Sequence, residues 1–229
     1  MFFYGFDRYF AVLVVPALIF SMAMQLVVKG AYRKQSRVSN ARHMTGAQAA
    51  LAVLRHYNIH DVRIENVPGK LNDHYDPRAK VIRLSEGVFN TASVAAVGIA
   101  AHEAGHAAQH AARYVPIRVR NAILPACNIG SSLGLPLVFI GFALSFDFLV
   151  TLGLLLFALI VVFQLVTLPV EFNASKRALQ VIESEDLLDG SDYKGARQVL
   201  RAAAMTYVAA LVVSVANLLR FALRFGRRR

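Results

Sequence analysis

Apolar residues in this chain gather in long uncharged stretches, and the first of these, Tyr9–Val28, runs for 20 residues. A helix needs about 20 apolar residues to cross a hydrocarbon layer of about 30 Å. One basic residue, Arg8, precedes the stretch, and Lys29 begins a group of four that follows it. A cleavable signal peptide has the opposite charge order, so the pattern predicts a membrane anchor that is retained.

Residues 122–170 form a second apolar region, in which Asp147 is the single charge in 49 residues. This length fits two helices, Ile123–Leu144 and Phe148–Leu168, joined by a turn at 145–147. The prolines of the first helix do not exclude it, because neighbouring groups can satisfy the freed carbonyls of a membrane helix. The region therefore predicts a hairpin whose two ends lie on one side of the membrane.

Orientation is predicted from the basic residues beside the apolar stretches. Of the 25 lysines and arginines, 14 lie between Lys29 and Arg120 and five more between residues 171 and 201. Segments rich in lysine and arginine stay in the cytoplasm. Both segments are therefore expected on the cytoplasmic side.

The last apolar run, Ala202–Leu219, is 18 residues long and includes several polar residues. If it spans the membrane, Arg224 and the arginines at 227–229 lie outside, against the positive-inside rule. A helix that lies along the membrane surface, or that packs without fully crossing, would avoid that conflict. Alternatively, the helix spans the membrane and the larger basic segment alone determines the orientation of the chain.

Composition supports a membrane protein and excludes two other classes. Hydrophobic residues make up 56% of the chain, charged residues 17%, and the mean hydropathy is +0.47, whereas a soluble domain has about 25% charged residues. The net charge of +11 is not accompanied by a nucleic-acid-binding motif, so no nucleic-acid partner is expected. The single Cys127 excludes an internal disulfide framework and a cysteine-based zinc site.

Shorter patterns lie between the first and second membrane segments. Thr45–Tyr57 is typical of a helix with a capping box, and Asp61–Val67 and Lys80–Leu84 are typical of strands. The polar residues at 73–77 predict a turn before the second strand. An alanine-rich stretch, Thr91–Ala112, predicts a longer helix, so this part of the chain is expected to be a small α+β unit.

The alanine-rich helix contains the pentapeptide His102-Glu103-Ala104-Gly105-His106. Positions i and i+4 of a helix lie on one face, about 6 Å apart along the axis, so both imidazoles can reach one zinc ion. Glu103 lies beside them, where it can accept a proton from water. Buried without a metal, these polar groups would be costly, which favours zinc binding over a chance match.

A catalytic zinc needs a third protein ligand, and the sequence offers two candidates. His110 continues the ladder, but it lies about 9 Å along the axis from a metal placed between His102 and His106. Glu171 is the first charge after the hairpin and returns to the side of the histidines after two crossings. Glu171 is therefore the better candidate, although a carboxylate there could also mark the membrane boundary.

The chain resembles the YugP-like family of bacterial membrane neutral zinc metallopeptidases and, more distantly, the HtpX-type gluzincins. The resemblance is carried by five segments: DHYDPRAKVIRLSE (73–86), AAHEAGHAAQ (100–109), RNAILPACNIGS (120–131), FQLVTLPVEFNASKRAL (163–179) and AAAMTYVAA (202–210). It implies a zincin-like unit in which His102, His106 and Glu171 hold Zn2+ and Glu103 is the general base.

Two positions depart from the patterns of these families. Ser175 stands where HtpX-type enzymes have an aspartate, and Asn173 stands where YugP-like proteins commonly have one. Each departure removes a carboxylate that could orient a ligand histidine. The loss of such a partner can weaken metal affinity or activity about 10- to 100-fold.

The oxyanion of a peptide-hydrolysis reaction needs a hydrogen-bond donor besides zinc. His74, Tyr75 and Arg177 have suitable chemistry, and the sequence does not rank them. His74 and Tyr75 could instead cap a turn, and Arg177 could anchor a helix at the membrane surface.

The fold class expected is a membrane α-helical protein with about four transmembrane or membrane-associated helices and a small α+β zincin-like cytoplasmic unit. The expected parts are an N-terminal anchor with a basic linker, the unit with the HExxH helix, a transmembrane hairpin, a cytoplasmic segment with the third ligand, and a C-terminal membrane helix with a basic tail, at 1–40, 41–121, 122–170, 171–201 and 202–229.

The functional hypothesis is a zinc endopeptidase of the bacterial inner membrane whose active site faces the cytoplasm. Protein or peptide substrates that are membrane-associated or unfolded, together with the lipid bilayer, are the expected partners. The alternative is a non-catalytic, zinc-stabilised membrane scaffold, whose function would survive the Glu103→Gln substitution. A transporter is disfavoured because the spans contain few ionisable groups.

Overall fold

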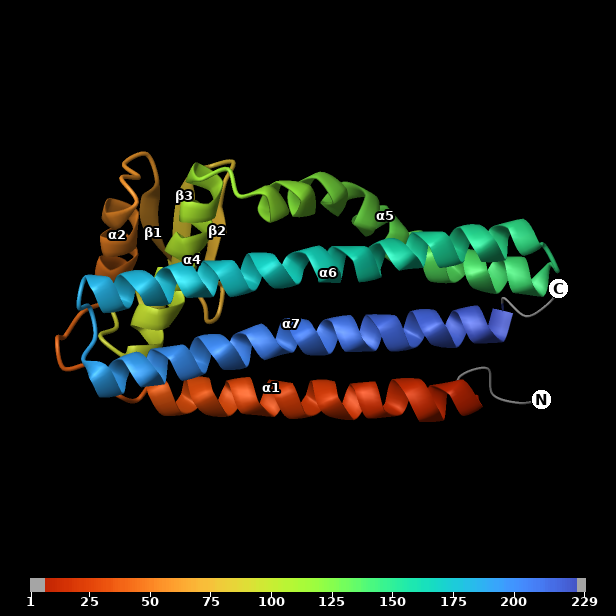
Figure 1. Cartoon of the computed structure of the whole chain (residues 1–229), viewed down its shortest axis with the longest axis horizontal. Coiled ribbons are helices and arrows are strands. Elements are labelled where there is room, and N and C mark those ends of the chain that lie inside the picture. The colour runs from red at the N-terminus through yellow and green to blue at the C-terminus, as the bar shows by residue number, and fades with distance from the viewer. Residues whose placement is uncertain (1–6, 226–229) are drawn as a thin grey trace. The chain divides into compact units, whose positions relative to one another are not determined.

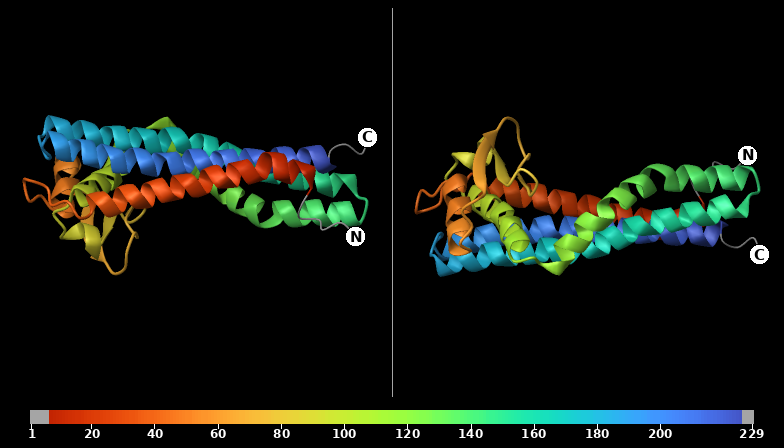
Figure 2. Two further views of the ribbon diagram at one scale, coloured as in Figure 1. Left: turned by 90° about the horizontal axis from the view of Figure 1, so that it is seen from below. Right: turned by 90° about the horizontal axis from the view of Figure 1, so that it is seen from above.

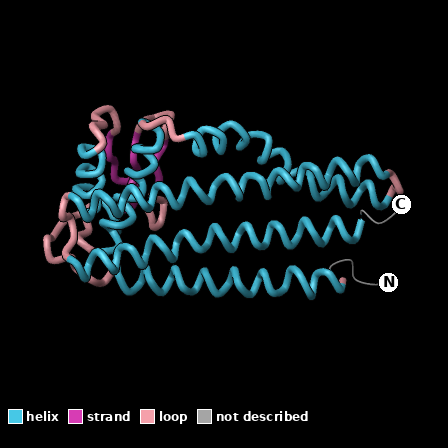
Figure 3. Tube along the Cα trace, in the orientation of Figure 1, coloured by secondary structure: helices cyan, strands magenta, loops and turns pink. Residues whose placement is uncertain are grey.

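The computed structural model describes residues 7–225 and is mostly helical, with one three-stranded sheet (Figure 1; Figure 3). The arginines at 227–229, part of the predicted basic tail, lie outside the described residues. The elements in chain order are a short π-helix η1 (Phe10–Val14), α1 (Val15–Gln35), α2 (Gly46–His56), β1 (Arg63–Val67), β2 (His74–Asp76), β3 (Val81–Ser85), α3 (Glu86–Phe89), α4 (Val94–Ala111), α5 (Val115–Ala143), α6 (Asp147–Ser184) and α7 (Gly190–Phe225).

Within the described residues, four helical stretches are long and apolar enough to cross a membrane, namely Phe10–Gln35, Val115–Ala143, Asp147–Ser184 and Gly190–Arg224. Together with the small sheet they confirm the predicted fold class. The helices are longer than the apolar runs that predicted them. In particular, α6 and α7 each continue without interruption beyond their apolar parts (Figure 2).

Contacts divide the described chain into two compact units. We call residues 7–25, Arg118–Leu168 and 205–225 the bundle unit, and Leu26–Ile117 with Pro169–Ala204 the sheet unit. The bundle unit contains most of the apolar helical residues. The sheet unit contains all three strands and the HExxH helix α4.

Close backbone approach holds the α5–α6 hairpin of the bundle unit together. A Cβ atom added to Gly153 would lie 2.6 Å from the Gly134 carbonyl oxygen, and one on Gly130 would lie 2.6 Å from that of Leu156. Small residues at such positions let membrane helices pack closely where lipid supplies no hydrophobic driving force. Buried clusters then join α7 to this hairpin through Phe221 and to α1 through Ala216.

The sheet of the sheet unit has the order β1-β3-β2, with β1 parallel and β2 antiparallel to β3. The central strand β3 is almost wholly buried, including Val81, Ile82 and Leu84, because it has a neighbour on each edge. The alanines of α4 belong to the same buried cluster as Ile82 and Leu84. Small side chains on α4 therefore allow the HExxH helix to lie within the core.

Local signals explain where the helices of this unit begin. The Thr45 hydroxyl accepts from the Gln48 N–H at 3.3 Å, and the Gln48 amide oxygen accepts from the Thr45 N–H at 2.9 Å, which confirms the predicted capping box. The helix α4 begins at Val94, later than predicted, because the Ser93 hydroxyl accepts from the Ala96 N–H and caps it there.

The segment at 73–77, predicted as a turn, contains the three-residue strand β2. Such a short, polar strand shows no alternation in sequence and is defined by its pairing with β3. The turn begins only at Asp76, whose carboxylate accepts from the N–H groups of Arg78 and Ala79.

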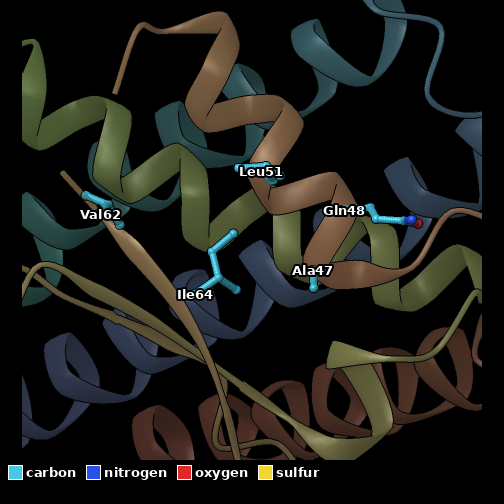
Figure 4. A pocket seen from close by; sticks show the side chains of 5 residues that line it. All are labelled: Ala47, Gln48, Leu51, Val62 and Ile64. Carbon is cyan, nitrogen blue, oxygen red and sulfur yellow. The ribbon is translucent and has the colours of Figure 1, made fainter. Parts of the chain in front are cut away.

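A shallow groove of about 350 Å³ lies in the sheet unit (Figure 4). Leu51 of α2 and Ile64 of β1 line it, with Ala47, Gln48 and Val62. Leu51 remains 39% exposed there. The α2 face of the sheet is therefore incompletely covered.

Candidate metal centre

The histidines of the HExxH sequence lie one helical turn apart on α4. Their ring centroids are 4.7 Å apart and the rings meet edge to face. The side chains of His102 and His106 are 16% and 13% exposed. The helix therefore presents two nearly buried imidazoles to the same point, as the spacing predicted.

Glu171 of α6 completes a group of three ligand atoms. Its Oε2 lies 3.4 Å from His102 Nε2 and 3.7 Å from His106 Nε2, and its side chain is 4% exposed. Ligands at about 2.0–2.1 Å from a tetrahedral zinc ion lie about 3.3 Å from one another. The donor types and their separations therefore fit zinc, and the group is the metal-ligand cluster found among the described residues.

Gly105 allows α4 and α6 to approach closely enough for this geometry. A Cβ atom at position 105 would lie 2.5 Å from the Ala174 carbonyl oxygen. Ala174 lies three residues beyond Glu171 and is fully buried. The glycine between the two histidines is thus a packing requirement of the site.

The imidazole of His106 contacts the side-chain amide of Gln109, one turn further along α4. Gln109 Oε1 lies 3.0 Å from His106 Nδ1, and Gln109 Nε2 donates to the Val170 carbonyl at 2.7 Å. Because Nε2 is committed as a donor, Oε1 can only accept, so His106 must carry its proton on Nδ1. The lone pair of His106 Nε2 is then free to bind a metal.

Asn173 extends this chain of hydrogen bonds. Its Oδ1 accepts from Gln109 Nε2 at 3.0 Å and from Arg177 Nε at 2.9 Å. Gln109 itself is fully buried. The neutral amide at position 173 thus links α4 to α6 where YugP-like proteins commonly have a carboxylate.

Ser175 contacts the other histidine, with its Oγ 3.1 Å from His102 Nδ1. A hydroxyl can both donate and accept, so this contact orients the ring but does not decide which nitrogen carries the proton. The hydrogen bonds at Nδ1 therefore fix the proton position of His106 but not that of His102.

Glu103 is tied to the sheet. The backbone N–H of Tyr75 on β2 donates to Glu103 Oε2 at 3.0 Å. Burial raises the pKa of Glu103, whereas the charges of His102 and His106 act in the opposite direction. A carboxylate with a raised pKa is a better proton acceptor near neutral pH.

The loop before β2 is fixed by Asp73. Its carboxylate accepts from the backbone N–H of Ser85 at 2.8 Å and from the Ser85 hydroxyl. This contact ties the start of β2 to the end of β3. It therefore sets the position from which the Tyr75 N–H reaches Glu103.

The three candidate oxyanion donors lie in different environments. The imidazole of His74 contacts the Asn72 carbonyl and the Arg83 guanidinium. The Tyr75 ring meets the His110 ring edge to face at 5.6 Å, and burial raises the pKa of Tyr75. Arg177 bonds to Asn173 and lies over the ring of Tyr57.

Sequence reasoning did not single out Gln109 or Asp73. Gln109 follows His106 by three positions, so the i, i+3 spacing was a signal that could have identified it. Its partners on α6 are more than 60 positions away in sequence and could not be inferred from spacing.

Four candidate membrane helices and a buried His-His-Glu group define a membrane protein with a candidate zinc centre. The family model described as "Putative neutral zinc metallopeptidase" matches residues 10–226, and the chain belongs to this family.

A protein of Bacillus subtilis (strain 168) with the name "Putative membrane protease YugP" is 44% identical over 217 residues, which cover 94% of this chain and 96% of the relative. No solved structure matches the chain. The family predicted from the sequence is confirmed.

Proposed function

We propose that the protein is an integral-membrane zinc endopeptidase of the gluzincin type, in which His102, His106 and Glu171 hold the metal. The convergence of both Nε2 atoms on Glu171 Oε2, at 3.4 Å and 3.7 Å, carries this proposal. Membership of a zinc metallopeptidase family supports it.

A zinc ion held there would polarise a substrate carbonyl and lower the pKa of water to about 7. Glu103 accepts the proton of the attacking water and passes it to the amine that leaves. The hydrogen bond from the Tyr75 N–H keeps its carboxylate in place, and burial keeps its pKa raised.

Tyr75 is the oxyanion donor that we favour. Its raised pKa keeps the hydroxyl protonated, and its ring packs against His110, one turn beyond His106 on α4. His74 and Arg177 already contact other groups. A Tyr75→Phe variant keeps the ring and the backbone donor and removes the hydroxyl alone.

The active site is assigned to the cytoplasmic side, and membrane-associated or unfolded proteins are the substrates. Support comes from the 19 lysines and arginines in Lys29–Arg120 and 171–201, the sum of 14 and five, since such segments stay in the cytoplasm. The continuation of the helix that carries Glu171 from a candidate membrane span supports a site near the bilayer surface.

The test compares wild type with Glu103→Gln, both purified with zinc and incubated with several unfolded proteins. Fragments are detected by mass spectrometry, and bound zinc is measured by elemental analysis. We expect zinc to be retained and cleavage to fall by about 10²- to 10⁴-fold. Zinc binding with no cleavage by either protein would favour the scaffold instead.

A further inference from the structure

A second groove in the sheet unit lies between α6 and α7 and has a volume of about 330 Å³. Its basic lining consists of Lys176 from α6 and of Arg197 and Arg201 from α7. Phe172, Tyr193 and Glu183 also contribute. Three positive charges and one negative charge therefore surround one cavity.

These three basic side chains are exposed and have no ion-pair or hydrogen-bond partner within residues 7–225. Some other basic residues of the sheet unit have acidic partners. Arg42, for example, pairs with both Asp186 and Asp189. The groove therefore keeps an uncompensated positive charge, which favours an anionic ligand.

The positive charge lies at one end of the groove. Glu183 and Lys176 are seven positions apart on α6, which corresponds to about 10 Å along the helix. On α7, Arg201 directly precedes the apolar run that begins at Ala202. On α6, Phe172 follows the apolar run by two positions and is 47% exposed.

The basic end of the groove is thus the end next to both apolar runs. Aromatic and basic residues at the ends of membrane helices meet the headgroup layer. Basic pockets between membrane helices at this depth bind the phosphates of anionic lipids.

We propose that this groove binds the phosphate of an anionic phospholipid from the adjoining leaflet. Lys176, Arg197 and Arg201 bind the phosphate, and Phe172 contacts the upper part of the acyl chains. The proposal does not depend on zinc or on peptide hydrolysis, because none of these four side chains belongs to the ligand group.

The experiment measures lipid retention by native mass spectrometry of the purified full chain, offered equal amounts of phosphatidylglycerol and phosphatidylcholine. The groove variant is Lys176→Gln/Arg197→Gln/Arg201→Gln. The control is Arg33→Gln/Lys34→Gln/Lys194→Gln, which removes the same charge from exposed residues outside the groove. Helical content by circular dichroism verifies that both are folded.

Wild type and control are expected to retain phosphatidylglycerol in preference to phosphatidylcholine. In the groove variant, the ratio of retained phosphatidylglycerol to phosphatidylcholine should fall about tenfold or more. Equal losses in the groove and control variants would overturn the proposal, because the attraction would then be diffuse. The absence of a preference in wild type would overturn it as well.

Two competition arms distinguish other sources of negative charge. Inorganic phosphate at the lipid concentration should leave the lipid bound, since it lacks acyl chains. Displacement by free phosphate would indicate a phosphate site that is independent of lipid. Displacement by an acidic peptide would indicate a peptide site, and either result would overturn the lipid assignment.

Discussion

Gln109 determines which nitrogen of His106 is available to a metal. Its amide nitrogen donates to Val170 and Asn173, so its oxygen must accept from His106 Nδ1. The same side chain links the HExxH helix to the helix that carries Glu171. One buried amide therefore orients one ligand and joins the two helices on which the site depends.

Gln109→Ala should weaken zinc binding by about 10- to 100-fold, because the tautomer of His106 is no longer fixed. Competition with a chromophoric chelator measures the affinity. Gln180→Ala, on the exposed face of α6, is the control and should leave zinc affinity unchanged. Unaltered zinc affinity in a folded Gln109→Ala protein would contradict the role assigned to the amide.

A substitution at Ser175 is predicted to strengthen zinc binding, whereas the substitution at Gln109 weakens it. Ser175→Asp supplies a carboxylate that can only accept when ionised, which fixes the His102 tautomer and raises the basicity of that ligand. We expect tighter zinc binding, by up to about tenfold. Ser175→Ala should weaken zinc affinity less than Gln109→Ala does, and the reverse order would show that the serine is the more important support.

The sequence predicted the three residues that form the candidate ligand group, whereas it could not predict the contacts that orient their side chains. The i, i+4 spacing predicts that His102 and His106 share a helical face, and two membrane crossings return Glu171 to their side. The hydrogen bonds of Asn173 and Ser175 depend on how α4 packs against α6, which no local pattern encodes. Sequence suggested only that carboxylates were missing at these two positions.

At the scale of elements, the pairing of α4 with α6 depends on a backbone contact. Ala174 approaches Gly105 so closely that no side chain fits between them. The alanines of α4 fill the rest of the buried face. The site is thus built on two helices whose separation is set by the smallest residues in the sequence.

Gly105→Ala should separate α4 from α6 and destabilise the protein by about 1–3 kcal/mol, as overpacking does. It should also reduce bound zinc, because Glu171 moves away from the histidines. Thermal unfolding and zinc content are the two measurements. Gly30→Ala is the control: a Cβ atom there meets nothing within 4 Å, so it should be neutral or stabilising.

The long helices were predicted well because their signal is a continuous property of about 20 residues. Their ends were predicted less well, because polar residues at 171–184 and 190–201 continue the helices beyond the apolar runs. The strand β2 was not predicted because it is too short to show a local pattern. Its three residues are ordered by β3 and by the Asp73 contact with Ser85, neither of which is local.

For the whole molecule, the arginines at the end of α7 are compensated within the bundle unit. Asp7 pairs with both Arg220 and Arg224. If all four candidate helices cross the membrane, this cluster lies on the side opposite the HExxH helix, where the positive-inside rule disfavours arginines. The pairing stabilises the end of α7 within the bundle unit. Whether this last helix spans the membrane stays a prediction.

Asp7→Asn should lower the free energy of unfolding by about 1–3 kcal/mol, because it leaves partly buried arginines without their counter-charge. It should also reduce the fraction of chains whose C-terminus lies outside. Thermal unfolding in detergent and thiol labelling of a C-terminal cysteine in intact cells measure the two effects. Asp147→Asn, at an exposed residue of the hairpin, should change neither by a comparable amount.

The helix α6 is continuous from Asp147 to Ser184, so it connects a candidate membrane span directly to Glu171 of the candidate metal centre. The helix that carries Glu171 also contains a candidate membrane span. The tilt of a spanning helix responds to hydrocarbon thickness through hydrophobic mismatch. His102 and His106 lie on α4, which is not among the candidate spans found within residues 7–225. A change in membrane thickness is therefore expected to shift Glu171 relative to the two histidines, which would make metal affinity depend on lipid composition.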